Sequence, residues 1–222
     1  MENNKIEKAI ERGLTENVFD LAIDYAELGL DTFMDNDAIK EIPIVKSVVG
    51  LVKGGIAIRE IFLAKKLLTF LKEYHSGKIM QIKKEAFLQK FHDDKKYRES
   101  VVDQIMTLND RFISIEKSKV LANLFLAHLN DKFDWEGFCQ LSECLDDLHT
   151  RAFKILDDSA NSKDPFHFST FEEEKDGGGV LFSAGICIIH GNHYSVNTYG
   201  QYLYFYGIKG DIDFTFPITK QK

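Results

Sequence analysis

The sequence predicts a mainly α-helical protein with a small α+β unit at its C-terminal end. Apolar residues recur at spacings of three and four through most of residues 1–158, which is the period of an α-helix. Beyond this point, glycine-rich and polar stretches alternate with short runs rich in Ile, Val, Tyr and Phe, which favour strands. We therefore expect a helical domain over residues 1–158 and an α+β unit over residues 159–222, with residue 147 as the alternative start of the second unit.

Length and composition are those of an ordinary globular protein. The 222 residues are 44% hydrophobic and 28% charged, so the chain can bury a core without disulfides or a structural metal. The three cysteines, Cys139, Cys144 and Cys187, are too few and too scattered for a secreted disulfide framework. The first residues contain no apolar leader sequence. These features together predict a cytoplasmic protein, with the periphery of the inner membrane as the alternative place of action.

Helical spacing begins close to the N-terminus. Residues 4–35 are predicted to be helical, with a break near Gly13 and a helix cap at Thr15. The same spacing predicts helices throughout residues 79–129 and a helix that begins after an N-cap at Asp134. A further helix is expected over residues 147–158.

Residues 42–74 form the most unusual segment, because they are apolar and contain several glycines. Glycines four residues apart, such as Gly50 and Gly54, allow two helices to approach closely. Lys46 and Lys53 interrupt the apolar run, which makes a stable single membrane span unfavourable. Two interpretations remain open: a buried core helix, or a segment that docks on a membrane through a basic amphipathic helix.

The membrane interpretation defines a candidate binding surface in this segment. Its lysines are expected to be exposed, because lysine is rarely buried without a partner. Their positive charges would attract an anionic membrane or an acidic partner. The candidate membrane or partner surface consists of Gly50, Gly54, Arg59, Lys65, Lys66 and Lys72.

A β-hairpin followed by a helix is predicted near the C-terminus. Gly191-Asn192 lies between two runs of strand-forming residues, which is typical of a two-residue hairpin turn. The glycines at 177–179 are expected to form a flexible connector, and residues 211–218 to form an edge strand. The elements expected between them are a strand at Ile186–Ile189, a strand at Tyr194–Val196, a cap at Asn197 or Thr198, and a helix from Tyr199 to Tyr206.

No catalytic motif is present in the sequence. It contains no nucleophile elbow, no phosphate-binding loop and no dinucleotide fingerprint. His190 and His193 flank the predicted turn, but a zinc site needs four ligands in paired short spacings. We therefore predict a non-enzymatic protein with no catalytic residues, no cofactor and no metal site. A metal-dependent or cysteine-dependent enzyme remains an open alternative.

The final third of the chain resembles a winged-helix unit, in which a helical core precedes a two-stranded wing and a last helix. The likeness rests on LHTRAFKIL at 148–156 and GICIIHGNHYSVNTYGQYLYFYGI at 185–208. Together with the helical stretch LANLFLAHLNDKFDWEGFCQLSECLDDL at 121–148, the chain resembles bacterial abortive-infection proteins of the alpha type, over residues 42–208. This resemblance implies a component of antiviral defence that makes bacteria resistant to phage, acting at or near the membrane.

The charge of the C-terminal part favours a protein partner over nucleic acid. Residues 146–222 contain seven Lys or Arg and eleven Asp or Glu, whereas phosphate binding needs an excess of cations. The candidate wing tip, His190, Asn192 and His193, contains no Lys or Arg. We therefore predict an intracellular interaction protein that binds a protein partner. The sequence does not decide whether the chain forms oligomers. A nucleic-acid-binding regulator is the alternative.

Overall fold

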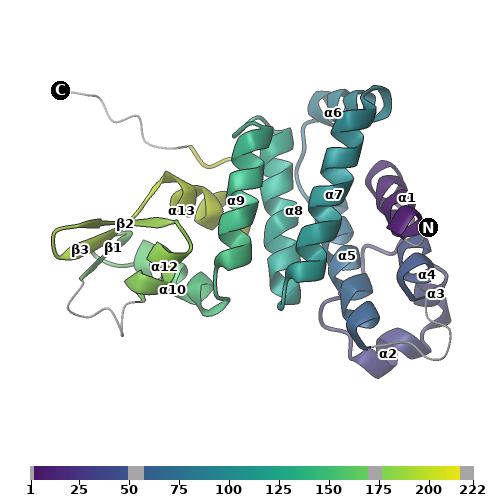
Figure 1. Ribbon diagram of the computed structural model, residues 1–222, viewed down its shortest axis with the longest axis horizontal. Helices are drawn as coiled ribbons and strands as arrows, with labels where there is room; N and C mark the ends of the chain where they lie inside the picture. The colour runs from purple at the N-terminus through teal and green to yellow at the C-terminus, as the bar shows by residue number, and fades with distance from the viewer. Residues whose placement is uncertain (1–2, 50–57, 170–176, 216–222) are drawn as a thin grey trace.

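The computed structural model describes residues 3–49, 58–169 and 177–215, and it confirms a mainly helical protein with a small antiparallel sheet near its C-terminus. The molecule is elongated, with a body of helices at one end and the sheet at the other (Figure 1). The helices of the body are α1 (Asn3–Thr15), α2 (Leu30–Asp35), α3 (Asp37–Lys40), α4 (Pro43–Val49), α5 (Ile58–Ser76), α6 (Gln81–Asp93), α7 (Lys95–Arg111), α8 (Ile115–Leu129) and α9 (Trp135–Asp147). The remaining elements are α10 (Arg151–Ala160), β1 (His167–Ser169), α12 (Gly178–Ser183), β2 (Cys187–His190), β3 (His193–Val196), α13 (Thr198–Tyr202) and the π-helix η2 (Leu203–Ile208).

Helices α5 and α8 pack against each other at the centre of the body. Both are buried on nearly every side, as expected for helices whose apolar residues are not confined to one stripe. The π-helix η2 packs on α8, and the Asn123 side chain of α8 donates a hydrogen bond of 2.9 Å to Gly207 O. This contact attaches the C-terminal unit to the body.

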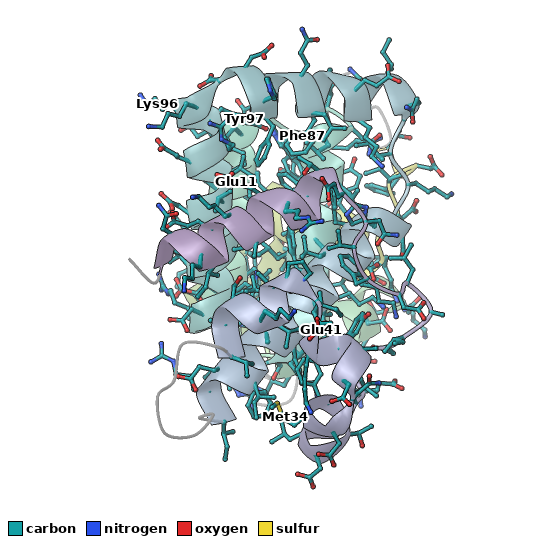
Figure 2. The ribbon with its side chains drawn as sticks, turned by 90° about the vertical axis from the view of Figure 1, so that its right-hand side faces the viewer. Glu11, Met34, Glu41, Phe87, Lys96 and Tyr97 are labelled. Atoms are coloured by element: carbon teal, nitrogen blue, oxygen red, sulfur yellow. The ribbon has the colours of Figure 1, made fainter. Side chains whose placement is uncertain are left out.

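A cluster of aromatic rings packs between α5, α6, α8 and α9. Phe125 lies at its centre, with ring centroids of Phe70, Tyr74, Phe87 and Phe138 between 5.5 and 6.1 Å away. Figure 2 shows Phe87 together with its neighbour Tyr97 below the uppermost helix, and their ring centroids are 6.5 Å apart. Several of the phenylalanines in the sequence are therefore used in the core of the body.

Local capping signals decide several helix boundaries. Asp134 is the N-cap of α9 as predicted, and its Oδ1 accepts a hydrogen bond of 2.8 Å from Gly137 N. Helix α4 begins at Pro43, because the missing N–H and fixed φ of proline suit the first turn of a helix. Helix α1 ends at Thr15, two residues after the predicted break near Gly13, and Thr15 is the last residue of this helix rather than the cap of a following one.

The helix predicted through residues 4–35 is interrupted over residues 16–29 and resumes only as α2. Residues 16–29 are turns and irregular backbone, although their apolar residues have helical spacing. Asp20 Oδ1 accepts a hydrogen bond from Ala22 N, and Asp24 Oδ1 accepts one from Ala26 N. These local side-chain bonds give the backbone an alternative to the helix and explain the error.

Two predictions in the C-terminal unit are also wrong. Gly178 and Gly179 are not a flexible connector, because they begin helix α12 after Gly177, whose φ is +73°. A Cβ at Gly178 would lie 2.5 Å from the ring of Tyr194, so tight packing requires glycine there. The predicted edge strand at 211–218 is absent from its described part, since residues 211–215 form turns and irregular backbone.

Candidate interaction surface

The predicted hairpin is confirmed and forms the outer part of a three-stranded antiparallel sheet. The strand order is β1-β3-β2, with Cys187 opposite Val196 and His190 opposite His193. Gly191 has φ +57°, which glycine adopts without strain at a two-residue turn. Asn197 is the predicted cap, and its Oδ1 accepts a hydrogen bond of 3.0 Å from Gly200 N. The predicted final helix follows as α13 and continues as η2.

The two faces of the hairpin differ in burial. Cys187, Tyr194 and Val196 are buried, and they lie on the face that packs against α12. The cross-strand pairing places His190 and His193 side by side on the opposite face, where both are exposed together with Asn192 at the turn. The three wing-tip residues therefore lie together on the surface, as the sequence predicts.

Three large apolar side chains near the hairpin are exposed, and sequence reasoning missed them. Phe182 on α12 is 48% exposed, and Ile188 and Ile189 on β2 are 42% and 46% exposed. Successive residues of a strand point to opposite faces, so Ile188 lies on the face of His190 and Ile189 lies on the face of Tyr194. The two isoleucines therefore flank the outer edge of β2, and exposed apolar side chains along such an edge mark a candidate interaction site. We call Phe182, Ile188, Ile189 and the wing-tip residues the wing surface.

The wing surface lies in a part of the chain that has no charged side chains. From Gly177 to Ile208 the sequence contains no Asp, Glu, Lys or Arg, although 28% of the whole chain is charged. Depletion of charge together with abundant aromatic residues is the compositional signal of a protein interface core. This run is visible in the sequence, so it could have identified the surface before the structure was known.

The surroundings of the three cysteines do not favour nucleophilic chemistry. Burial raises the pKa of the Cys187 thiol to about 11, and burial also raises the pKa of the Cys139 and Cys144 thiols. A nucleophilic cysteine needs the opposite shift, because the reactive form is the thiolate. All three residues are free thiols that pack as small apolar groups.

The candidate basic surface in residues 42–74 is not formed. Lys65 and Lys66 are only 4% and 6% exposed, so the prediction that they are exposed is wrong. Lys65 Nζ donates a hydrogen bond to Leu28 O, and Lys66 Nζ donates to Phe112 O at 2.7 Å and to Asp110 O at 3.3 Å. Burial lowers the pKa of both ammonium groups. Main-chain carbonyls, rather than acidic side chains, provide the partners that make this burial possible.

The other residues of that candidate surface do not gather into one site. Arg59 is exposed and pairs with Asp110 at 2.7 Å, whereas Lys72 is largely covered and its Nζ lies 3.9 Å from Asp24 Oδ2. Gly50 and Gly54 lie outside the described residues. The described parts of residues 42–74, α4 and α5, are packed helices, which supports the core-helix interpretation.

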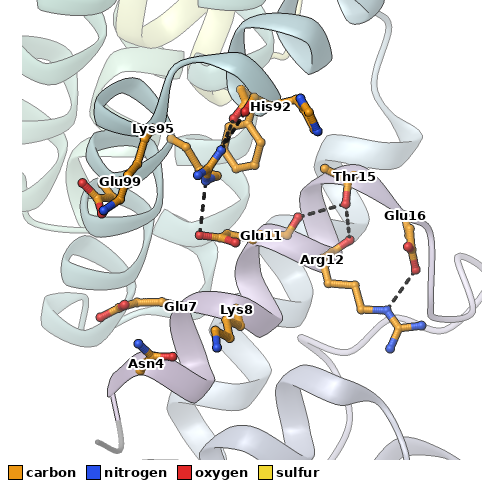
Figure 3. A pocket seen from close by; sticks show the side chains of 12 residues that line it. Asn4, Glu7, Lys8, Glu11, Arg12, Thr15, Glu16, His92, Lys95 and Glu99 are labelled. Carbon is orange, nitrogen blue, oxygen red and sulfur yellow. Dashed lines mark hydrogen bonds and ion pairs between the residues drawn. The ribbon is translucent and has the colours of Figure 1, made fainter.

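A charged groove of about 650 Å³ lies between α1 and the corner formed by α6 and α7 (Figure 3). Arg98 donates hydrogen bonds of 2.9 Å to Phe91 O and His92 O, and its Nε is 3.7 Å from Glu11 Oε1. Lys95 pairs with Glu99 at 3.4 Å. The groove is lined by four basic and four acidic side chains, so it does not favour a ligand of one sign. The lining residues are Asn4, Glu7, Lys8, Glu11, Arg12, Thr15, Glu16, Phe91, His92, Lys95, Arg98 and Glu99.

The described ranges offer no metal site or membrane-spanning helix, and no known relative points to another candidate. Within the described ranges, no three His, Cys, Asp or Glu side chains converge in a way that could hold a metal ion. None of the helices in those ranges combines the length and apolar content needed to cross a bilayer. No protein-family model, curated protein or solved structure matches this chain. The wing surface is therefore the candidate that the geometry supports best.

Proposed function

We propose that this chain is a non-enzymatic protein that binds a protein partner through the wing surface. The observation that carries the proposal is the exposure of Phe182, Ile188 and Ile189 in a segment without any charged residue. Apolar area removed from water contributes about 25 cal/mol per Å². The segment itself contributes no charged side chain, so its own burial on binding requires no ion to be desolvated.

The same surface is poorly suited to nucleic acid. Affinity for DNA depends on Lys and Arg side chains that neutralise phosphates, and the wing tip provides only His190, Asn192 and His193. Enzymatic function also has little support, because the raised pKa of each of the three thiols keeps them protonated near neutral pH. Both considerations favour a binding protein.

Site-specific photo-crosslinking tests whether the wing surface binds a protein. A benzophenone amino acid at Ile188 is expected to give a discrete adduct when cells that produce the full chain are irradiated. The matched control is the same amino acid at Ile113, which is 99% exposed at the turn between α7 and α8. Immunoblotting should show the adduct for position 188 and none above background for position 113. Equal adducts at both positions, or none at either, would contradict the proposal.

The proposed cellular context is bacterial defence against phage, in the cytoplasm or at the inner membrane. Its support is the resemblance to abortive-infection proteins of the alpha type, together with the agreement of the hairpin and the final helix with that resemblance. Free thiols at all three cysteines are compatible with a reducing compartment.

A plaque assay tests this context. Bacteria that express the chain are expected to form fewer plaques than control cells with at least one phage of a panel. The double variant Ile188→Lys, Ile189→Lys should lose this protection at an unchanged protein level, because it places charges on the wing surface. No protection against any phage of the panel would refute the defence context. If the double variant still protected the cells, defence would not depend on the wing surface.

A further inference from the structure

Strand β2 is an edge of the sheet, and half of its main-chain groups point away from β3. Asn197 N donates a hydrogen bond of 3.1 Å to Ile186 O, so these two opposite residues form a hydrogen-bonded pair of the antiparallel ladder rather than a non-hydrogen-bonded pair. Because antiparallel pairs alternate, Ile188 and His190 also direct their N–H and C=O groups toward β3. Cys187 and Ile189 must then direct theirs outward. In the part of the chain that the structure describes, no strand pairs with this outer edge.

Apart from its length of four residues, the outer edge of β2 lacks the features that normally prevent strands from pairing. Soluble proteins protect edge strands with Lys, Pro, bulges or inward-pointing charges. The strand is Cys-Ile-Ile-His, its pairing with β3 is regular, and its two isoleucines are 42% and 46% exposed. An exposed apolar edge of this kind is a template for the addition of a further strand.

A second copy of β2 matches this edge in both hydrogen bonding and side chains. If two copies run antiparallel about a two-fold axis at Ile188, each Cys187 lies opposite Ile189 of the other copy. The outward N–H and C=O groups of these residues then form about four hydrogen bonds between the copies. The two Ile188 side chains meet on one face, and Cys187 and Ile189 meet on the other.

Charge also favours a second copy. The chain carries a net charge of −7, so two copies repel each other unless the surfaces that meet are neutral. The segment Gly177–Ile208 supplies such a surface, because it contains no Asp, Glu, Lys or Arg. A two-fold contact uses the same patch on both molecules, which a neutral patch permits without repulsion.

We infer that the chain forms a two-fold symmetric dimer in which β2 pairs with β2 of a second copy, giving a continuous sheet across the interface. This inference rests on the proposed function, since it identifies the protein partner of the wing surface. The dimer buries one short strand and its neighbours from each copy, so it belongs to the smaller interfaces, which are typically weak.

Sedimentation equilibrium of the full chain tests the inference over about 1 to 100 μM, the range of a weak to moderate dimer. The mass is expected to rise from 25.5 kDa toward twice that value with concentration. Ile188→Lys should raise the dimer dissociation constant at least about tenfold, because two like charges would then face each other at the axis. Ile189→Pro removes an outward N–H without removing a bond to β3, and should weaken the dimer as well. Ile113→Lys makes the same substitution at a distant exposed site and should leave the dimer dissociation constant unchanged.

The possible results separate this inference from the proposed function. A wild-type chain that stays at 25.5 kDa throughout, or a dimer that Ile188→Lys leaves intact, overturns the two-fold pairing. If such a chain still gives an adduct of another mass from position 188, the proposed function stands and its partner is a different protein. If it also gives no adduct, both proposals fail. Should Ile189→Pro unfold the unit, the folded Ile188→Lys variant decides the result.

Discussion

Replacement of Lys66 by glutamate is expected to lower the free energy of unfolding by about 3–5 kcal/mol, the usual cost of leaving a buried charge without a partner. Lys66 Nζ donates hydrogen bonds to Phe112 O and Asp110 O, where α7 ends at Arg111. The carbonyls at a helix C-terminus carry partial negative charge, so an ammonium group is favourable there and a carboxylate is repelled. Urea denaturation followed by circular dichroism measures the change.

The control is Lys119→Glu, which makes the same change in charge on the exposed face of α8. Its effect should stay within about 0.5 kcal/mol, as is usual for exposed sites. Lys66→Met tests the hydrogen bonds separately, because it keeps the apolar stem while leaving both carbonyls without their donor. Equal stability of Lys66→Glu and Lys119→Glu would mean that Lys66 reaches solvent and would contradict its buried position.

Replacement of Phe125 by alanine is expected to lower the free energy of unfolding by about 3–5 kcal/mol, because it removes a ring from the centre of the core. Phe125 is fully buried, and its ring centroid lies within 6.3 Å of those of Phe70, Tyr74, Phe87, His128 and Phe138. These residues come from α5, α6, α8 and α9, so the cavity would weaken contacts between several helices at once. Differential scanning calorimetry should show a markedly lower Tm.

The matched control for this prediction is Phe182→Ala. Phe182 is 48% exposed on α12, so its removal should cost less than about 1 kcal/mol in the isolated chain. The comparison separates the loss of a ring from the loss of packing around it. A Tm for Phe125→Ala close to that of Phe182→Ala would contradict the central position of Phe125 in the core.

The correct predictions concern features whose energetics are local in sequence. The cap at Asp134 and the cap at Asn197 each form between a side chain and an N–H three residues later. The hairpin depends on Gly191-Asn192 and on the strand-forming runs on either side of it. In each case, residues that are near neighbours in the chain provide both partners of the interaction, so the pattern in the sequence contains the answer.

The errors concern residues whose partners are distant in sequence. Lys66 is buried because α7 ends beside it with two carbonyl groups, and no pattern around residue 66 contains that information. Gly178 lies in a helix although consecutive glycines have a low helix propensity, and the ring of Tyr194 packs so closely against it that a larger residue does not fit. Tertiary contacts outweighed the local preference at both positions.

The candidate surface combines both kinds of information. The wing-tip residues His190, Asn192 and His193 follow from the hairpin, and the run without charge from Gly177 to Ile208 can be read directly from the sequence. The exposure of Ile188 and Ile189 depends instead on β2 being the last strand in the order β1-β3-β2. Strand order, and the elements that cover each face of the sheet, are long-range properties, because they depend on residues far from β2 in the chain. The sequence by itself thus determined a helical body with an uncharged hairpin, and only the tertiary structure decided which of its apolar side chains remain open to a partner.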